Sequence, residues 1–270
     1  MSRARRQARA LRRRALVGRI GRLGAGAVAG GVGATGAILA GQFIAAARRD
    51  PTAMLDPPPI TGTFGMSDDP PLRLAVLGDS AAAGYGVTTV EQSVPGQLAA
   101  RLAAAGWQVE LSGFAIAGSR TGDLGPQVSR ALLSRPDLAV LVIGSDDAVR
   151  LTRAKSVSYG VVDAVRRLRN HGVPVVVGTA PDLAAARGLG QPLRVVAGWR
   201  SRQVARVQLA ATRVAGGLPV DLAKECGPVF RADPGLLAAD GWHPSVDGAR
   251  IWVDALEPMI LDAAGSPATY

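Results

Sequence analysis

Cysteine, histidine and asparagine are scarce in this sequence of 270 residues. The single cysteine, Cys226, excludes an intrachain disulfide, so the core must hold the fold, and we assign its thiol no chemistry. The only histidines, His171 and His243, leave two candidates for a catalytic base. The only asparagine is Asn170, so a function that needs an asparagine side chain elsewhere must use a different residue.

Positive charge is concentrated at the N-terminus. Residues 1–50 contain eleven arginines and one acidic residue, whereas residues 51–270 contain twenty basic and twenty acidic residues. The formal net charge of +10 therefore belongs to the N-terminal segment. A nucleic-acid-binding domain usually carries its positive charge on its folded surface. We therefore expect no nucleic-acid partner, and an arginine-rich arm that binds nucleic acid is the alternative.

An uncharged run, residues 23–47, follows nine of these arginines. It is long enough to cross a bilayer as a helix, which needs about 20 residues. The preceding arginines predict that the N-terminus stays in the cytoplasm and that the rest of the chain lies outside the membrane. We expect a signal peptide, with "AAA" at 45–47 as the candidate cleavage site, or an uncleaved membrane anchor. A disordered Gly/Ala-rich tail is the alternative.

Composition and patterning divide the chain into four predicted regions. Residues 1–50 form the basic N-terminus with its signal or anchor segment. Residues 51–71 form a linker, because "DPPPITGTFGMSDDPP" (56–71) is rich in proline and suits neither a helix nor a sheet ladder. Residues 72–262 form the folded domain, and residues 263–270 form a C-terminal tail.

Strand and helix patterns alternate along residues 72–262. Apolar or alternating runs predict five strands, at 72–78, 107–113, 138–144, 173–179 and 218–223. Helical spacing of apolar residues predicts helices at 94–106, 156–172, 199–217 and 245–263. This alternation predicts an α/β fold with a mostly parallel, five-stranded sheet covered on both faces. Ligands of such folds bind beyond the carboxyl ends of the strands.

Two motifs contain residue types that are used in nucleophilic catalysis. "VLGDSAAAGYG" (76–86) places Ser80 after the first predicted strand, at the expected start of a helix whose free N–H groups would favour an oxyanion. "AADGWHPSVDG" (238–248) places Asp240 three residues before His243. A serine nucleophile needs a base, and the base needs a carboxylate that orients it. The alternatives are a helix N-cap for Ser80 and a solvated surface side chain for His243.

Four blocks of the sequence, in order, resemble the SGNH/GDSL hydrolase family. They are "GDS" (78–80), "FAIAGSRTGDL" (114–124), "IGSDDA" (143–148) and "DGWHP" (240–244), within a similarity that covers residues 72–260. The sequence is particularly similar to exported actinobacterial esterase- or lipase-like members. The resemblance implies a three-layer α/β/α sandwich and hydrolysis of small-molecule or lipid esters without a cofactor.

The resemblance also implies a role for each matching residue. Ser80 would be the nucleophile, His243 the base and Asp240 the carboxylate that orients the base. The backbone N–H groups of Ser80 and Gly118 would donate hydrogen bonds to the oxyanion.

The third block departs from the family pattern at Asp146, where the family has an asparagine that donates to the oxyanion. An ionised aspartate only accepts hydrogen bonds, and the loss of one oxyanion donor costs about 10²–10³ in rate. Burial can raise a carboxyl pKa, so a protonated Asp146 that donates, with more activity at lower pH, is one interpretation. The other is a catalytically impaired, membrane-tethered binding protein.

A metal-dependent hydrolase built on Asp79, Asp146, Asp147 and Asp240 is a third hypothesis. The sequence does not favour it, because it has two histidines and no close cluster of ligands, and we expect no metal. Tyr85, Trp199 and Trp242 are candidates for aromatic walls around a substrate, with core packing as the alternative for each.

Overall fold

The computed structural model describes Gly41 and residues 56–267. Apart from Gly41, the predicted signal or anchor segment at 23–47 lies outside the described residues, and so do residues 51–55 of the predicted linker and 268–270 of the tail. No helix in the described part of the chain combines the length and the apolar character that a membrane crossing requires.

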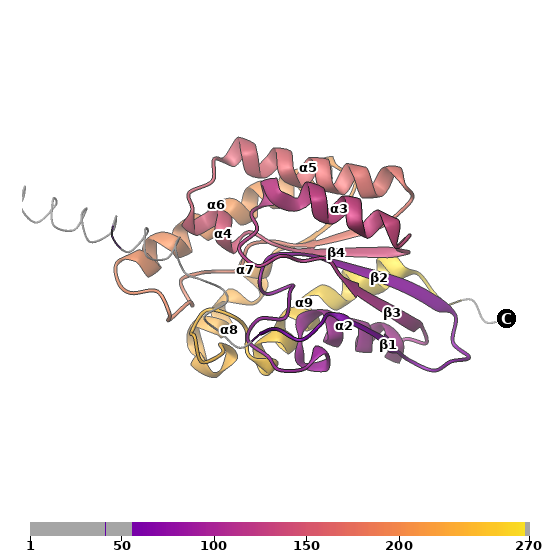
Figure 1. Ribbon diagram of the computed structural model, residues 1–270. Helices are drawn as coiled ribbons and strands as arrows, with labels where there is room; N and C mark the ends of the chain where they lie inside the picture. Colours follow the sequence, from indigo (N-terminus) through magenta and orange to yellow (C-terminus); the bar gives the residue numbers. More distant parts are fainter. Residues whose placement is uncertain (1–40, 42–55, 268–270) are drawn as a thin grey trace, which may run out of the picture. The chain divides into compact units, whose positions relative to one another are not determined.

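A six-stranded sheet lies at the centre of residues 56–267, in the order β1-β3-β2-β4-β5-β6 (Figure 1). The strands are β1 (Thr61–Phe64), β2 (Pro71–Gly78), β3 (Gln108–Gly113), β4 (Leu138–Val142), β5 (Val175–Gly178) and β6 (Leu218–Val220). Strands β2 to β6 run parallel, whereas β1 pairs with β3 in the antiparallel direction. The predicted mostly parallel α/β fold is confirmed, and all five predicted strands are present.

Strand β1 corrects two predictions. The sheet has six strands rather than five. The additional strand, β1, lies within residues 56–71, which were predicted to form a linker that pairs with no strand. An edge strand tolerates flanking prolines because only one of its sides is paired. The Gly113 N–H donates to the Ile60 carbonyl at 2.7 Å, and Gly113 has no side chain that would collide with Ile60. This close approach lets a short segment pair with β3.

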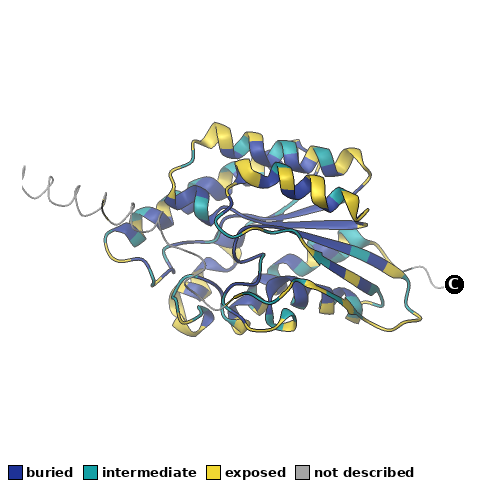
Figure 2. Cartoon of the chain, in the orientation of Figure 1, coloured by how far each residue is buried: buried dark blue, intermediate teal, exposed yellow. Residues whose placement is uncertain are grey.

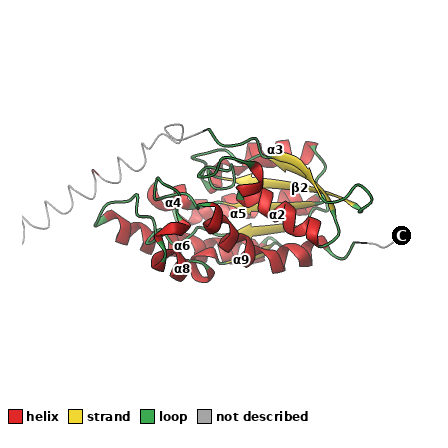
Figure 3. Ribbon diagram, turned by 90° about the horizontal axis from the view of Figure 1, so that it is seen from below, coloured by secondary structure: helices red, strands yellow, loops and turns green. Residues whose placement is uncertain are grey.

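Helices cover both faces of the sheet, which makes the predicted three-layer sandwich. The longer helices are α2 (Val94–Ala104), α3 (Leu124–Leu133), α5 (Ala154–Asn170), α6 (Leu193–Val214) and α9 (Val246–Ala264). Helices α3, α5 and α6 lie on one face, and α2 and α9 lie on the other, as Figures 1 and 3 show. The short helices are α4 (Ser145–Val149), α7 (Leu222–Glu225) and α8 (Gly227–Ala232). Helix α3 and the three short helices were not predicted from the sequence.

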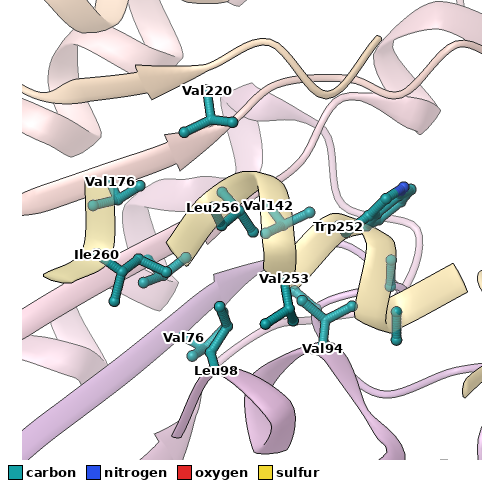
Figure 4. Packing of buried hydrophobic residues seen from close by; sticks show 14 of the residues in the cluster. Val76, Val94, Leu98, Val142, Val176, Val220, Trp252, Val253, Leu256 and Ile260 are labelled. Carbon is teal, nitrogen blue, oxygen red and sulfur yellow. The ribbon is translucent and has the colours of Figure 1, made fainter. Parts of the chain in front are cut away.

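The central strands are apolar along their whole length because both of their faces are buried (Figure 2). On one face, α9 directs Val253, Leu256 and Ile260 toward the strands and toward Val94 and Leu98 of α2 (Figure 4). The spacing of these α9 residues puts them on one side of the helix. Each fully buried Val or Leu contributes about 1.5–3 kcal/mol to folding. This packing sets the carboxyl ends of β2, β4 and β5 side by side.

Candidate active site

Ser80 follows strand β2 at the carboxyl edge of the sheet, after a turn that requires glycine at position 78. Gly78 has a φ of +145°, and a Cβ there would stand 1.9 Å from the Val142 carbonyl oxygen of β4. The chain after Ser80 forms successive turns and not the predicted helix. Gly84 and Gly86, with φ of +84° and +97°, leave the helical region and account for this difference.

Asp79 lies fully buried beneath Ser80. Its carboxylate accepts hydrogen bonds from the backbone N–H groups of Ala81 and Gly144, both at 3.2 Å. It therefore ties the Ser80 turn to the loop that follows β4. Burial, together with the nearby charge of Asp146, raises the pKa of Asp79 to about 7.

His243 and Asp240 come from the loop before α9, and they reach Ser80 from the other end of the chain. His243 Nε2 lies 2.8 Å from Ser80 Oγ, and His243 Nδ1 lies 2.6 Å from Asp240 Oδ2. Nδ1–H therefore donates to the aspartate, which leaves Nε2 free to accept the serine proton. All three predicted residues are thus joined in one chain of hydrogen bonds.

The Asp240 carboxylate is held in place by its own loop. Its Oδ1 accepts the backbone N–H groups of Trp242, at 2.9 Å, and of His243, at 3.1 Å. Burial alone would raise the pKa of Asp240, but the hydrogen bonds from His243 and from these backbone groups outweigh it and lower the pKa. Asp240 is therefore the ionised partner that a charged imidazole needs.

Gly118 lies in the loop after β3, and this loop continues the pairing with β2 as far as Gly78. The Phe114 N–H donates to the Val76 carbonyl at 2.8 Å, and the Ile116 N–H donates to the Gly78 carbonyl at 3.2 Å. Gly118 has a φ of +76°, a conformation that favours glycine. Within residues 56–267, neither the Ser80 N–H nor the Gly118 N–H has a protein acceptor. Both donors are available to a ligand.

Two buried glutamines support this edge, and neither was predicted from the sequence. Gln127 of α3 accepts from the Gly78 N–H at 2.9 Å and donates to the Gly78 carbonyl at 3.0 Å and to Ser119 Oγ at 3.1 Å. Gln208 of α6 accepts from the Ala180 N–H at 2.7 Å and donates to the Ile143 carbonyl at 2.8 Å. Both side chains are completely buried, so they fix the strand ends from one face of the sheet.

The adjacent carboxylates of Asp146 and Asp147 face different neighbours. Asp147 is completely buried and accepts from the Thr121 N–H at 2.8 Å and from Thr121 Oγ1 at 3.0 Å. Asp146 Oδ1 instead accepts from Arg150 Nε at 3.0 Å. Burial raises the pKa of both carboxyl groups; hydrogen bonds from Thr121 partly offset this in Asp147, and Arg150 does so in Asp146.

The remaining candidates divide between the site and its surroundings. The Tyr85 ring lies 5.6 Å from the His243 ring, centroid to centroid, so Tyr85 borders the imidazole. Trp242 lines a small apolar cavity together with Phe230, Leu237 and Trp252. Trp199 is 55% exposed on α6. His171 precedes β5, at the opposite edge of the sheet, where its Nδ1 donates to the Arg167 carbonyl at 2.8 Å.

Comparisons with known proteins match this arrangement of fold and motifs. The sequence profile of the GDSL-like Lipase/Acylhydrolase family matches residues 76–251. The chain belongs to the GDSL-like lipase/acylhydrolase family. A GDSL-like esterase of Mycobacterium tuberculosis is 36% identical over 259 residues, which cover 88% of this chain and 82% of that protein. Membership of the GDSL-like family makes the chain a carboxylic ester hydrolase that acts on small-molecule esters.

Solved structures of other ester hydrolases share the fold. A lipase/acylhydrolase from Enterococcus faecalis superposes with a TM-score of 0.60 at 20% identity, over 74% of this chain and 100% of that chain. An acetylxylan esterase from Geobacillus stearothermophilus gives a TM-score of 0.53 at 20% identity, over 76% and 100% of the two chains. These likenesses confirm the sandwich fold that the four blocks implied.

Proposed function

We propose that the protein hydrolyses acyl esters by covalent catalysis at Ser80, with His243 as the base and Asp240 as the carboxylate that orients it. The observation that carries this proposal is the unbroken chain of hydrogen bonds from Ser80 Oγ to Asp240, at 2.8 and 2.6 Å. A serine hydroxyl is a weak nucleophile at neutral pH unless a base removes its proton. The buried imidazole beside it is placed to do so.

The reaction then has two balanced steps. Ser80 Oγ attacks the ester carbonyl while its proton moves to His243 Nε2, and the collapsing intermediate releases the alcohol, which takes that proton. Water then attacks the acyl group while its proton moves to His243 Nε2, and the collapsing intermediate releases the acid as Ser80 Oγ takes that proton. In each step the carbonyl oxygen carries a negative charge, which the free N–H groups of Ser80 and Gly118 would stabilise.

We further propose that the enzyme acts outside the cytoplasmic membrane, either exported or tethered by residues 23–47. The support is in the sequence: eleven arginines within residues 1–50, an uncharged segment long enough to span a bilayer, and a neutral remainder. Oriented in this way, the hydrolase domain would meet esters on the outer side of the membrane.

The direct test is hydrolysis of a short p-nitrophenyl ester by purified residues 51–270 from pH 5 to 9, with Ser80→Ala as the blank. We expect turnover in the wild type and none in the variant. Equal rates in both would refute catalysis at Ser80. The absence of turnover in both would favour the alternative of a tethered binding protein with an impaired oxyanion site.

A further inference from the structure

Arg150 forms an ion pair with Asp146, the residue that the resemblance puts at the family's asparagine position. Arg150 follows α4 and lies one helical turn after Asp146. Its Nε donates to Asp146 Oδ1 at 3.0 Å, and this is the only hydrogen bond of its guanidinium to the part of the protein that the structure describes. The two Nη groups, with four N–H donors, are therefore open to another acceptor.

The free end of this guanidinium is directed toward Gly118. If Gly118 carried a Cβ, the one described atom within 4 Å of it, apart from those of residues 117–119, would be Arg150 Nη2, at 3.8 Å. Gly118 thus leaves open the space in front of the guanidinium, and its own N–H has no protein acceptor among residues 56–267. The Arg150 side chain is 37% exposed and its partner Asp146 is 16% exposed, so the pair lies at the surface of the site.

The Asp146 end of the pair lies close to the catalytic groups. The carboxylate is within electrostatic range of both Asp79, next to the nucleophile, and His243. One helical turn of α4 therefore places a carboxylate near the base and a guanidinium next to Gly118.

We propose that Arg150, held by Asp146, donates the third hydrogen bond to the oxyanion in place of the family's asparagine; this rests on the proposed Ser80 mechanism. Asp146 acts as a positioning residue that accepts from Nε and aims the Nη groups. Like an asparagine side chain, the ion pair as a whole has no net charge. Unlike an asparagine, it presents a charged donor to the reacting oxygen. Charge-assisted hydrogen bonds are about twice as strong as neutral ones.

The competing explanation treats Arg150 as an ordinary helix-surface partner and a protonated Asp146 as the donor. The two explanations predict opposite effects when the guanidinium is removed. Without Arg150, Asp146 holds its proton more readily, so a donor role for Asp146 predicts equal or greater activity. A donor role for Arg150 predicts a large loss.

The test compares Arg150→Gln, the double variant Asp146→Asn/Arg150→Gln and Arg250→Gln in ester hydrolysis by the full chain. We expect Arg150→Gln to lower kcat about 10²–10³-fold, the loss typical for one oxyanion donor, with little change in KM. The double variant restores the family's amide, so it should recover at least about ten-fold of that loss. Arg250 forms a similar ion pair with Asp247 at 3.0 Å on α9, and its variant should match the wild type.

Three outcomes would overturn the proposal. A wild-type or higher kcat in Arg150→Gln would assign the donor to Asp146. A loss that the double variant does not recover would show that Arg150 only holds the loop. Hydrolysis that persists in Ser80→Ala would refute the proposed mechanism itself. This outcome can be distinguished from the first two, because in those the hydrolysis still depends on Ser80.

Discussion

Asp146 and Asp147 are neighbours in the chain, yet their carboxylates serve different parts of the molecule. Asp147 is buried in the fold and joins α4 to the start of η3 (Thr121–Asp123), the segment that follows the Gly118 loop. Asp146 faces the site and pairs with Arg150. The second negative charge of "SDD" is therefore structural, whereas the first stands where the resemblance puts the family's asparagine.

The role of Asp147 predicts a loss of stability when its carboxylate is removed. Asp147→Ala leaves the Thr121 N–H and hydroxyl without their acceptor, and we expect the free energy of unfolding in urea to fall by about 1–3 kcal/mol. Asp163→Ala removes an exposed carboxylate that lies 3.8 Å from Arg167, and it should change stability by less than about 0.5 kcal/mol. Equal stability of the two variants would contradict the structural role.

The buried Asp79 predicts a pH dependence of stability. Its pKa is raised to about 7, above its ordinary value of 3.8, so the folded state holds a proton that the unfolded chain releases. This contribution is fully present below about pH 4 and is lost as pH rises through about 7. The side chain of the Asp79→Asn variant cannot titrate. Between pH 4.5 and 8.5 the wild type should therefore lose a few kcal/mol of unfolding free energy relative to this variant. A constant difference between the two proteins would contradict this assignment.

Strand β1 shows how an element can escape a sequence pattern. "TGTF" is short, lies among prolines and has no apolar run, so its composition favours a linker. What makes it a strand is tertiary: β3 presents a free edge, and Gly113 leaves room for Ile60. Propensity is a weak guide where a neighbouring strand supplies the hydrogen bonds.

If the β1 segment belongs to the core, its apolar side chains should stabilise the fold. Ile60, just before β1, and Phe64 of β1 pack against the core cluster. We expect the double variant Ile60→Ala/Phe64→Ala to lower the free energy of unfolding by about 2–4 kcal/mol, because both side chains are partly buried. Met66→Ala, at a side chain that is 72% exposed, should have little effect in the same urea titration. An unchanged midpoint for the double variant would mean that 56–71 is a linker after all.

Sequence patterns predicted the elements with a strong apolar pattern and missed those that depend on neighbours. The apolar strands β2, β4 and β5 and the amphipathic helices α5 and α9 have strong periodic patterns. The first turn of helix α3 contains Gly125 and Pro126, which favour a loop locally, although proline is tolerated in a first helical turn.

Among the site residues, too, the sequence indicated those with a strong local pattern and missed those that depend on tertiary neighbours. Ser80, Gly118, Asp240 and His243 lie in motifs, so the sequence indicated them. Gln127 and Gln208 lie on the buried faces of helices, where a polar residue among mostly apolar ones was the only signal. Arg150 has no motif, and only its position opposite Gly118 distinguishes it from the other arginines.

For the whole molecule, the separation of charge predicts where the protein is found in a cell. The eleven arginines and the uncharged segment lie within residues 1–50, and residues 51–270 are neutral. We expect full-length protein to sediment with membranes and residues 51–270 to remain in the supernatant after ultracentrifugation. Full-length protein recovered in the cytoplasmic supernatant would contradict the export or anchoring proposal.

The proposed mechanism depends above all on Ser80 as the nucleophile and on its activation by His243. Both are tested by covalent labelling with an alkyl fluorophosphonate, in which Ser80 Oγ bonds to phosphorus and fluoride leaves. Mass spectrometry should find one adduct, on the peptide that contains Ser80, and the labelling rate should fall by about 10³ or more in His243→Ala. An adduct on another residue, or equal labelling of folded wild type and His243→Ala, would contradict the mechanism.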